Sequence, residues 1–265
     1  MNIGKRVRLN RLFAHPSGNL CSVAVDHYIG YGDGLPDGLR RIRSTLAAVA
    51  AASPDAVTMH KGIAAACWGP YAGQIPWILQ STLARPDDSV HEQVATPEDA
   101  VRLGADAIAV AAFVRNATEG VYLRAVADCV RDAVPFDLPV ILHIYPRDKN
   151  GRISFQPEDI AWAVRGGVEM GVDVVKTPYC GDLEAHRQIV AECPVPLVAA
   201  GGPQCDSLHA ALAMMTDVMH SGARGATIGR NIWGVEAITA AVEAFKAVIH
   251  RGTTADQALG PAETP

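Results

Sequence analysis

The sequence lacks the features that would place it among disulfide-bonded, zinc-binding or membrane proteins. Its cysteines are widely spaced, with no CxxC pair and no metal-ligand spacing to histidine, so we expect reduced thiols that act as small core residues. They are Cys21, Cys67, Cys129, Cys180, Cys193 and Cys205. The basic N-terminal segment has no uninterrupted apolar core, and no apolar run is long enough to span a bilayer. We therefore expect a cytoplasmic protein.

The sequence also lacks blocks of like charge. Its net charge is −5, its pI is near 6.0, and lysines and arginines are scattered along the chain. This distribution argues against a nucleic-acid or membrane surface and leaves small anions as partners.

What the sequence does contain is a regular alternation of short apolar runs and longer Ala-rich helical patterns. The chain has 265 residues, is 49% hydrophobic, and has no strong linker or repeat, so we expect one domain spanning residues 1–265. The predicted strands are Cys21–Val25, Ala56–His60, Trp77–Ser81, Ala107–Ala111, Val140–Ile144, Val172–Lys176, Leu197–Ala200 and Ala226–Ile228. This count and alternation predict an α/β fold, a (β/α)8 TIM barrel, because an open doubly wound sheet usually has fewer strands.

Helical patterns separate the predicted strands. They cover Leu39–Ala52, Pro97–Leu103, Glu119–Val134, Pro157–Met170, Leu183–Cys193, Ser207–Ser221 and Val235–Ile249. Thr96 precedes Pro97 and two acidic residues, a typical helix start. Residues 251–265 are expected to form a poorly ordered tail.

In a TIM barrel the active site lies at the C-terminal ends of the strands. Lys176 closes an otherwise apolar run, so its amine is expected to project into the barrel mouth. Desolvation and nearby cations lower the pKa of such a lysine and increase the fraction of free amine, the nucleophile that forms an imine with a ketone. The alternative is a structural ion pair between Lys176 and Asp26 or another acidic residue.

Asp26 and Tyr145 end the first and fifth predicted strands and can therefore face the same cavity. A carboxylate can hold an amine or a substrate hydroxyl, and a phenol suits the proton transfers of aldol cleavage. The alternatives are a helix cap for Asp26 and a half-buried ring for Tyr145. His143 lies two residues before Tyr145, on the same face, and is either a packed core histidine or, with His27, a substrate-binding residue.

The last two strands each end in glycine ahead of a helix. Gly201 and Gly202 follow one strand, and Gly229 and Arg230 follow the other. Glycines allow backbone N–H groups to approach an anion, and the arginine adds a planar donor group. Barrels commonly hold phosphate at this position, so these four residues predict a phosphate site.

These segments together resemble the archaeal-type class I fructose-bisphosphate aldolase family and the related 2-amino-3,7-dideoxy-threo-hept-6-ulosonate synthases. The matching motifs, in order, are Val25-Asp26-His27, Tyr145-Pro146-Arg147, Val175-Lys176-Thr177-Pro178-Tyr179-Cys180-Gly181-Asp182, Gly201-Gly202-Pro203 and Gly229-Arg230-Asn231-Ile232-Trp233. The resemblance implies a Schiff base on Lys176, acid/base chemistry by Tyr145, an assisting carboxylate in Asp26, no metal or organic cofactor, and a homo-oligomer as large as a decamer.

The resemblance implies a class I aldolase acting on a phosphorylated ketose with a dihydroxyacetone phosphate-like donor. A transaldolase-like synthase, a thiolase-like transferase, and an isomerase or phosphometabolite binder without covalent chemistry are the alternatives. The chain departs from the family in the loop Tyr28–Gly34, which carries two aromatic rings. Arg85 and Lys61 either meet a second anionic group or are solvated surface charges.

Overall fold

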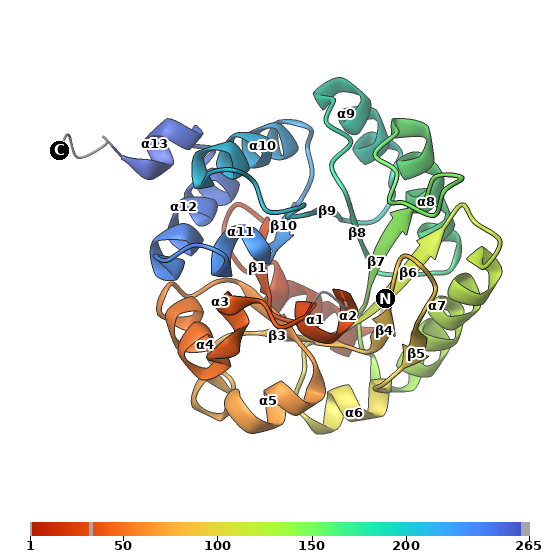
Figure 1. The fold of residues 1–265 in the computed structure, drawn as a ribbon. Coiled ribbons are helices and arrows are strands. Elements are labelled where there is room, and N and C mark those ends of the chain that lie inside the picture. Colours follow the sequence, from red (N-terminus) through yellow and green to blue (C-terminus); the bar gives the residue numbers. More distant parts are fainter. Residues whose placement is uncertain (1, 32–33, 261–265) are drawn as a thin grey trace.

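A closed barrel of eight parallel strands forms the centre of the protein. The computed structural model describes residues 2–31 and 34–260, and Figure 1 views the barrel along its axis. Around the barrel the strands run β1 (Leu20–Ala24), β10 (Gly225–Ile228), β9 (Leu197–Ala200), β8 (Val174–Thr177), β7 (Val140–Pro146), β6 (Ala107–Val114), β3 (Trp77–Gln80) and β2 (Ala56–Met59). All eight predicted strands are present, and the TIM-barrel prediction is confirmed.

Helices form the outer ring of the barrel (Figure 1). They are α3 (Asp37–Arg40), α4 (Ile42–Ala51), α5 (Lys61–Cys67), α6 (Pro97–Arg102), α7 (Glu119–Ala133), α8 (Pro157–Glu169), α9 (Leu183–Glu192), α10 (Leu208–His220) and α12 (Ile238–Arg251). Each predicted helix has a counterpart, although the one expected over Leu39–Ala52 is divided at Arg41. No helix among the described residues has the length and apolar character needed to cross a membrane.

Several short elements were not predicted. They are α1 (Ile3–Leu12), α2 (His27–Tyr31), the 3-10 turns η1 (Gly69–Tyr71) and η2 (Val134–Phe136), the hairpin of β4 (Thr82–Ala84) and β5 (His91–Gln93), α11 (Arg230–Trp233) and α13 (Ala255–Leu259). The expected disordered tail therefore needs correction: Arg251 ends α12, and Thr254 forms a capping box that starts α13. Residues 261–265 of that tail lie outside the described residues.

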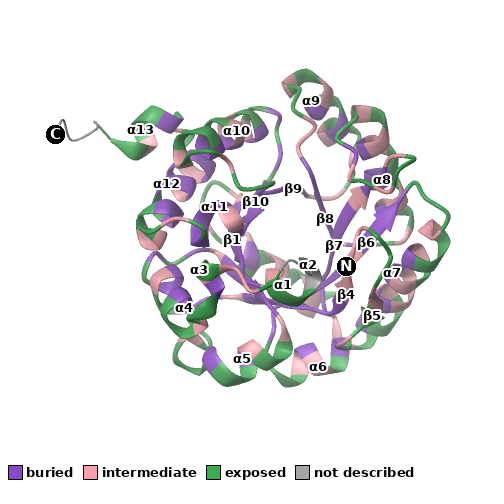
Figure 2. Ribbon diagram, in the orientation of Figure 1, coloured by how far each residue is buried: buried purple, intermediate pink, exposed green. Residues whose placement is uncertain are grey.

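The N-terminal end of the barrel interior is apolar and closed. Its buried side chains come from the N-terminal halves of the strands and are Leu20, Ala56, Ile78, Ala107, Ala109, Ile141, Val174 and Val198. We call this set the barrel floor. Helix α1 covers it: Leu12 is fully buried in the cluster, and Arg11 pairs with Asp106 at 2.8 Å. Figure 2 shows the strands buried and the outer faces of the helices exposed.

On β7 and β8 the inward side chains change from apolar to polar along the strand. On β7, Ile141 belongs to the floor, His143 lies one inward position higher, and Tyr145 lies above both. On β8, Val174 is followed at the next inward position by Lys176. A second apolar cluster packs the outer face of the barrel against the helices. The fold thus leaves its polar interior at the C-terminal end of the strands.

Candidate active site

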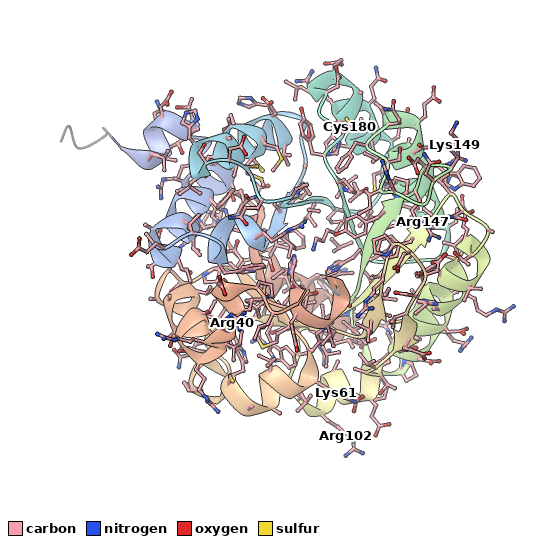
Figure 3. All side chains as sticks on the ribbon, viewed as in Figure 1. Arg40, Lys61, Arg102, Arg147, Lys149 and Cys180 are labelled. Carbon is pink, nitrogen blue, oxygen red and sulfur yellow. The ribbon has the colours of Figure 1, made fainter. Side chains whose placement is uncertain are left out.

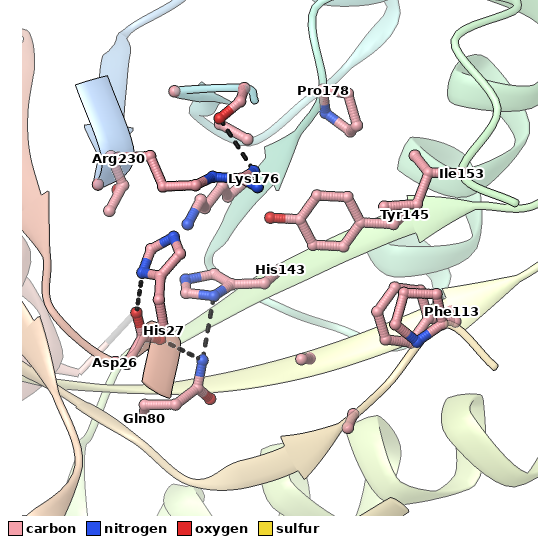
Figure 4. A pocket seen from close by; sticks show the side chains of 18 of the residues that line it. Asp26, His27, Gln80, Phe113, His143, Tyr145, Ile153, Lys176, Pro178 and Arg230 are labelled. Atoms are coloured by element: carbon pink, nitrogen blue, oxygen red, sulfur yellow. Dashed lines mark hydrogen bonds and ion pairs between the residues drawn. The ribbon is translucent and has the colours of Figure 1, made fainter. Parts of the chain in front are cut away.

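A pocket opens at the C-terminal ends of the strands. Its polar lining comes from Asp26, His27, His60, Gln80, Thr82, His143, Tyr145, Lys176, Thr227 and Arg230, and its glycines are Gly201, Gly202 and Gly229. All nine predicted site residues line this one pocket. Figure 4 shows it from close by.

Lys176 lies deep in the pocket, on β8. Only 5% of it is exposed. Its pKa is lowered from 10.5 to about 8: burial is the main cause, the negative charge of Asp26 partly opposes the shift, and the positive charge of Arg230 adds to it. The unprotonated fraction of the amine near neutral pH is therefore much larger than for an ordinary lysine, and this neutral form is the one that forms an imine.

Asp26, at the end of β1, is the anionic partner in this pocket. Its Oδ1 lies 3.2 Å from Nδ1 of His27, and its Oδ2 accepts a hydrogen bond of 2.9 Å from Nε2 of Gln80. Burial alone would raise the pKa of Asp26, but the hydrogen bond and charge of His27, with the charges of Lys176 and His143, hold it well below its ordinary value. The carboxyl group is thus ionised throughout the physiological range.

Gln80, on β3, is held in one orientation by its neighbours. Its Oε1 accepts hydrogen bonds from the backbone N–H of Thr82 (3.3 Å) and from the Thr82 hydroxyl (3.2 Å), and that hydroxyl accepts from Ala111 N (2.7 Å). A backbone N–H can only donate, so the atom facing it is the amide oxygen of Gln80. The amide nitrogen must then face Asp26 and His143.

The orientation of Gln80 determines the protonation of His143. The Gln80 amide nitrogen lies 3.3 Å from Nδ1 of His143, which must therefore accept the hydrogen bond. Burial, and then the charge of Lys176, lower the pKa of His143 well below 6.5, so the ring is neutral. Its proton consequently sits on Nε2, and in Figure 4 that side of the ring faces the centre of the pocket. His143 can donate a hydrogen bond to a substrate oxygen.

Tyr145 projects from β7 across the pocket. Figure 4 shows its hydroxyl directed toward Lys176 and His143. Its ring stacks on Phe113 of β6, with centroids 5.7 Å apart and an angle of 30° between the planes. The stacking fixes the ring while leaving the hydroxyl at the reacting centre.

The predicted phosphate site lies at the ends of β9 and β10. Gly202 has a φ of +72°, a conformation that favours glycine, and a Cβ on Gly229 would displace the His27 ring. Arg230 Nη2 donates to the Gly202 carbonyl at 3.1 Å, and Asn231 donates to the Gly201 and Pro203 carbonyls at 2.8 and 2.9 Å. Asn231 thereby joins the two glycine loops, a role that the sequence analysis missed.

Two other cations considered from the sequence lie outside the pocket lining. Lys61 pairs with Asp99 at 3.1 Å and lies on the outer rim in Figure 3. Arg85 contacts the Ile29 carbonyl and the Ser89 hydroxyl, each at 3.5 Å. The surface-charge alternative is therefore favoured for Lys61, whose side chain is 47% exposed, whereas Arg85 is half-buried. No cluster of His, Cys, Asp or Glu in the described part of the chain could hold a metal ion.

The chain is similar to aldolases and to related synthases. The family described as "DeoC/LacD family aldolase" matches residues 20–234. A 2-amino-3,7-dideoxy-D-threo-hept-6-ulosonate synthase of Halobacterium salinarum is 33% identical over 262 residues, covering 98% of this chain and 96% of that protein. A 2-amino-4,5-dihydroxy-6-oxo-7-(phosphonooxy)heptanoate synthase of Streptomyces griseus is 29% identical over 261 residues, covering 97% and 94%.

Two solved structures have the same fold. An archaeal fructose 1,6-bisphosphate aldolase has a TM-score of 0.83 and 28% identity, covering 94% of this chain and all (100%) of that one. A structure of an archaeal fructose-1,6-bisphosphate aldolase with its catalytic lysine covalently bound to the carbinolamine intermediate of the substrate has a TM-score of 0.83 and 27% identity, covering 93% of this chain and 99% of that one.

Proposed function

Because the chain belongs to the DeoC/LacD family of aldolases, we propose that it makes or breaks a carbon–carbon bond beside the ketone of a phosphorylated ketose, through a Schiff base on Lys176. The observation that carries the proposal is a buried amine of lowered pKa, about 8, at the centre of a pocket that also holds a carboxylate and a phenol. Burial favours the neutral amine, and only that form attacks a carbonyl carbon.

The reaction follows from the chemistry of an imine. Nζ of Lys176 bonds to the ketone carbon, and loss of water gives a protonated imine. In cleavage, a proton leaves the hydroxyl two carbons from the imine carbon, and the bond between the α- and β-carbons breaks. The β-carbon half leaves as an aldehyde, and the electron pair of the broken bond enters the imine to form an enamine. Protonation of the enamine carbon and addition of water then release the ketone and restore the amine.

The proton transfers fall to the groups around Lys176. Tyr145 takes the hydroxyl proton in cleavage and returns a proton to the enamine carbon, because its hydroxyl faces the amine (Figure 4). Asp26, always ionised, stabilises the protonated imine and accepts from a substrate hydroxyl. His143 donates its Nε2–H to a substrate oxygen, and His27 holds Asp26 in place.

The donor end of the substrate carries the phosphate. Backbone N–H groups at Gly202, Gly229 and Arg230, together with the Arg230 guanidinium, bind it beside Lys176, and Gly201 gives the loop room to pass β10. The names of the relatives support a three-carbon donor. A 2-amino-4,5-dihydroxy-6-oxo-7-(phosphonooxy)heptanoate and a fructose 1,6-bisphosphate both divide, by an aldol disconnection beside the ketone, into dihydroxyacetone phosphate and an aldehyde.

A synthase that joins the donor to a second substrate is the other candidate, and the names of two curated relatives favour it. It uses the same imine, and its turnover stops when no acceptor is supplied. A thiolase-like transfer is less well supported, because it gives Tyr145 no proton to move. Self-association into a homo-oligomer, suggested by the family resemblance, stays a prediction that light scattering of the purified protein tests.

Proton exchange into the donor tests the proposed function without any acceptor. Dihydroxyacetone phosphate in D2O should exchange one α-hydrogen through the enamine, a change that NMR detects, and added EDTA should not stop it. Lys176→Arg should abolish the exchange, since a guanidinium stays protonated and forms no imine. Lys61→Arg, on the outer rim, is the matched control and should exchange at the wild-type rate. Exchange that persists in Lys176→Arg would contradict the proposal.

A further inference from the structure

The pocket has two sides of different chemistry. In the barrel order, β9 and β10, which carry the predicted phosphate site, lie opposite β3 and β6. Five apolar residues line the pocket at β4, β6 and the loop after β7, and we call them the apolar wall: Ala84, Pro86, Phe113, Ile153 and Phe155. Figure 4 shows Arg230 and Lys176 on one side, Phe113 and Ile153 on the other, and Tyr145 between them.

The apolar wall has no basic side chain to bind an anion. Among the described residues that line the pocket, Lys176 and Arg230 are the only lysine and arginine, and both lie on the donor side. His60, on the neighbouring β2 side, has its Nδ1 3.2 Å from the Gln80 carbonyl.

Arg147 lies behind the wall, and its charge is paired with that of Asp88. Its side chain is 0% exposed, Nη1 donates to the Pro86 carbonyl and to Asp88 at 2.8 Å each, and Nη2 donates to the Thr118 hydroxyl at 2.7 Å. Its guanidinium lies 5.8 Å from the centre of the Phe113 ring. Arg147 therefore holds two wall residues, Pro86 and Phe113, in position and presents no charge to the pocket.

We propose that the aldehyde partner of this enzyme is uncharged and carries an apolar substituent, aryl or branched alkyl, which packs on the wall. The proposal rests on the proposed function. An anionic group placed there would lose its water without gaining a cation, whereas an apolar group gains by leaving water. Phe155 is 43% exposed at the wall, an apolar surface that such a substituent would cover.

The bond-forming step needs no further reactant. The donor ketone condenses with Lys176 and releases water, and loss of an α-proton gives the enamine. The enamine carbon bonds to the aldehyde carbon, and the aldehyde oxygen takes a proton to become a hydroxyl. Water then hydrolyses the imine and frees the amine.

An aldehyde panel tests the proposal separately from the imine chemistry. Exchange of dihydroxyacetone phosphate in D2O establishes the donor half first; if that fails, the proposed function fails and the panel is not interpreted. With exchange present, condensation is measured with phenylacetaldehyde, isobutyraldehyde and glyceraldehyde 3-phosphate. We expect kcat/KM for the better uncharged aldehyde to exceed that for glyceraldehyde 3-phosphate by roughly tenfold or more. An equal or higher value for the phosphorylated aldehyde overturns the proposal.

A charge placed on the wall should reverse the preference. Ile153→Arg should raise kcat/KM for glyceraldehyde 3-phosphate and lower it for phenylacetaldehyde, changing their ratio by roughly tenfold or more. Val121→Arg adds the same charge on an exposed face of α7, 58% exposed, and should leave the ratio unchanged. If Ile153→Arg still forms the imine but keeps the wild-type ratio, the wall does not select the aldehyde.

Discussion

The two ends of the barrel interior are built from the same strands and have opposite chemistry. At the N-terminal end the floor is apolar, buried and covered by α1. One or two inward positions higher, the same strands present Gln80, His143 and Lys176, linked to Asp26 by hydrogen bonds or charge. Strand β7 contains the whole contrast within five residues, from Ile141 to Tyr145.

The comparison separates what holds the barrel together from what it does. The floor gains free energy by removing apolar surface from water. Above the floor, Lys176, Asp26 and His143 form what we call the upper layer, which buries an amine, a carboxyl and an imidazole. Burial opposes the charged form of each of these groups. Substitutions in the floor should therefore lower stability, whereas substitutions in the upper layer should lower activity. The following predictions test that division in order of decreasing effect.

Replacing the central amine should give the largest loss. Lys176→Met is expected to reduce kcat by on the order of 10^4-fold or more, because no imine can form. The same variant should unfold at higher denaturant concentration than the wild type at pH 7. The lysine binds its proton less tightly in the folded state than in the unfolded state, so its burial cost is fully present below about pH 8 and fades as the pH rises toward 10.5. A Lys176→Met protein less stable than wild type at pH 7 would contradict the division.

Removing one hydroxyl should separate imine formation from proton transfer. Tyr145→Phe keeps the ring stacked on Phe113 and is expected to lower kcat by about 10^2–10^4-fold. Borohydride should still trap the donor on Lys176 in this variant. Full turnover in Tyr145→Phe would remove the phenol from the mechanism.

A truncation in the floor should act on stability alone. Ile141 is 2% exposed, and Ile141→Ala should cost about 2–5 kcal/mol of unfolding free energy through lost burial and a cavity. Urea denaturation measures the loss. The folded fraction should retain the wild-type pH profile, because Ile141 belongs to the apolar floor. A shifted profile would show that the two ends are coupled.

The smallest expected effect is a shift in pH dependence. The rate of imine trapping should rise with pH and level off above about 8, as the pKa of Lys176 implies. The negative charge of Asp26 raises that pKa, so Asp26→Asn should lower it and move the rise to lower pH. Trapping rates between pH 6 and 10 provide the measurement. A rise that moves to higher pH in Asp26→Asn would contradict the prediction.

The barrel and the site residues at its strand ends could be predicted from the sequence because both depend on local patterns. Lys176 stood out as a charge closing an apolar run, and Gly229-Arg230 stood out as a loop ahead of a helix. Helix α1 was not recognised because it is mostly polar, and Leu12 is its only fully buried residue.

Contacts across the barrel could not be read from local patterns. Gln80 could be placed at a strand end from the sequence. Its hydrogen bond to His143, however, depends on the arrangement of β3 and β7 on either side of β6 in the barrel. Arg147 belonged to a recognised motif, yet its burial behind Phe113 follows from Asp88 and Thr118, which come from distant loops. Such roles arise from closure of the barrel.

Covalent trapping tests the central claim most directly. The protein is incubated with dihydroxyacetone phosphate and borohydride, digested, and its peptides are weighed by mass spectrometry. We predict that the reduced adduct is found on the peptide containing Lys176 and is absent from the peptides containing Lys61 and Lys149. An unmodified Lys176 under conditions in which the enzyme turns over the donor would contradict the account.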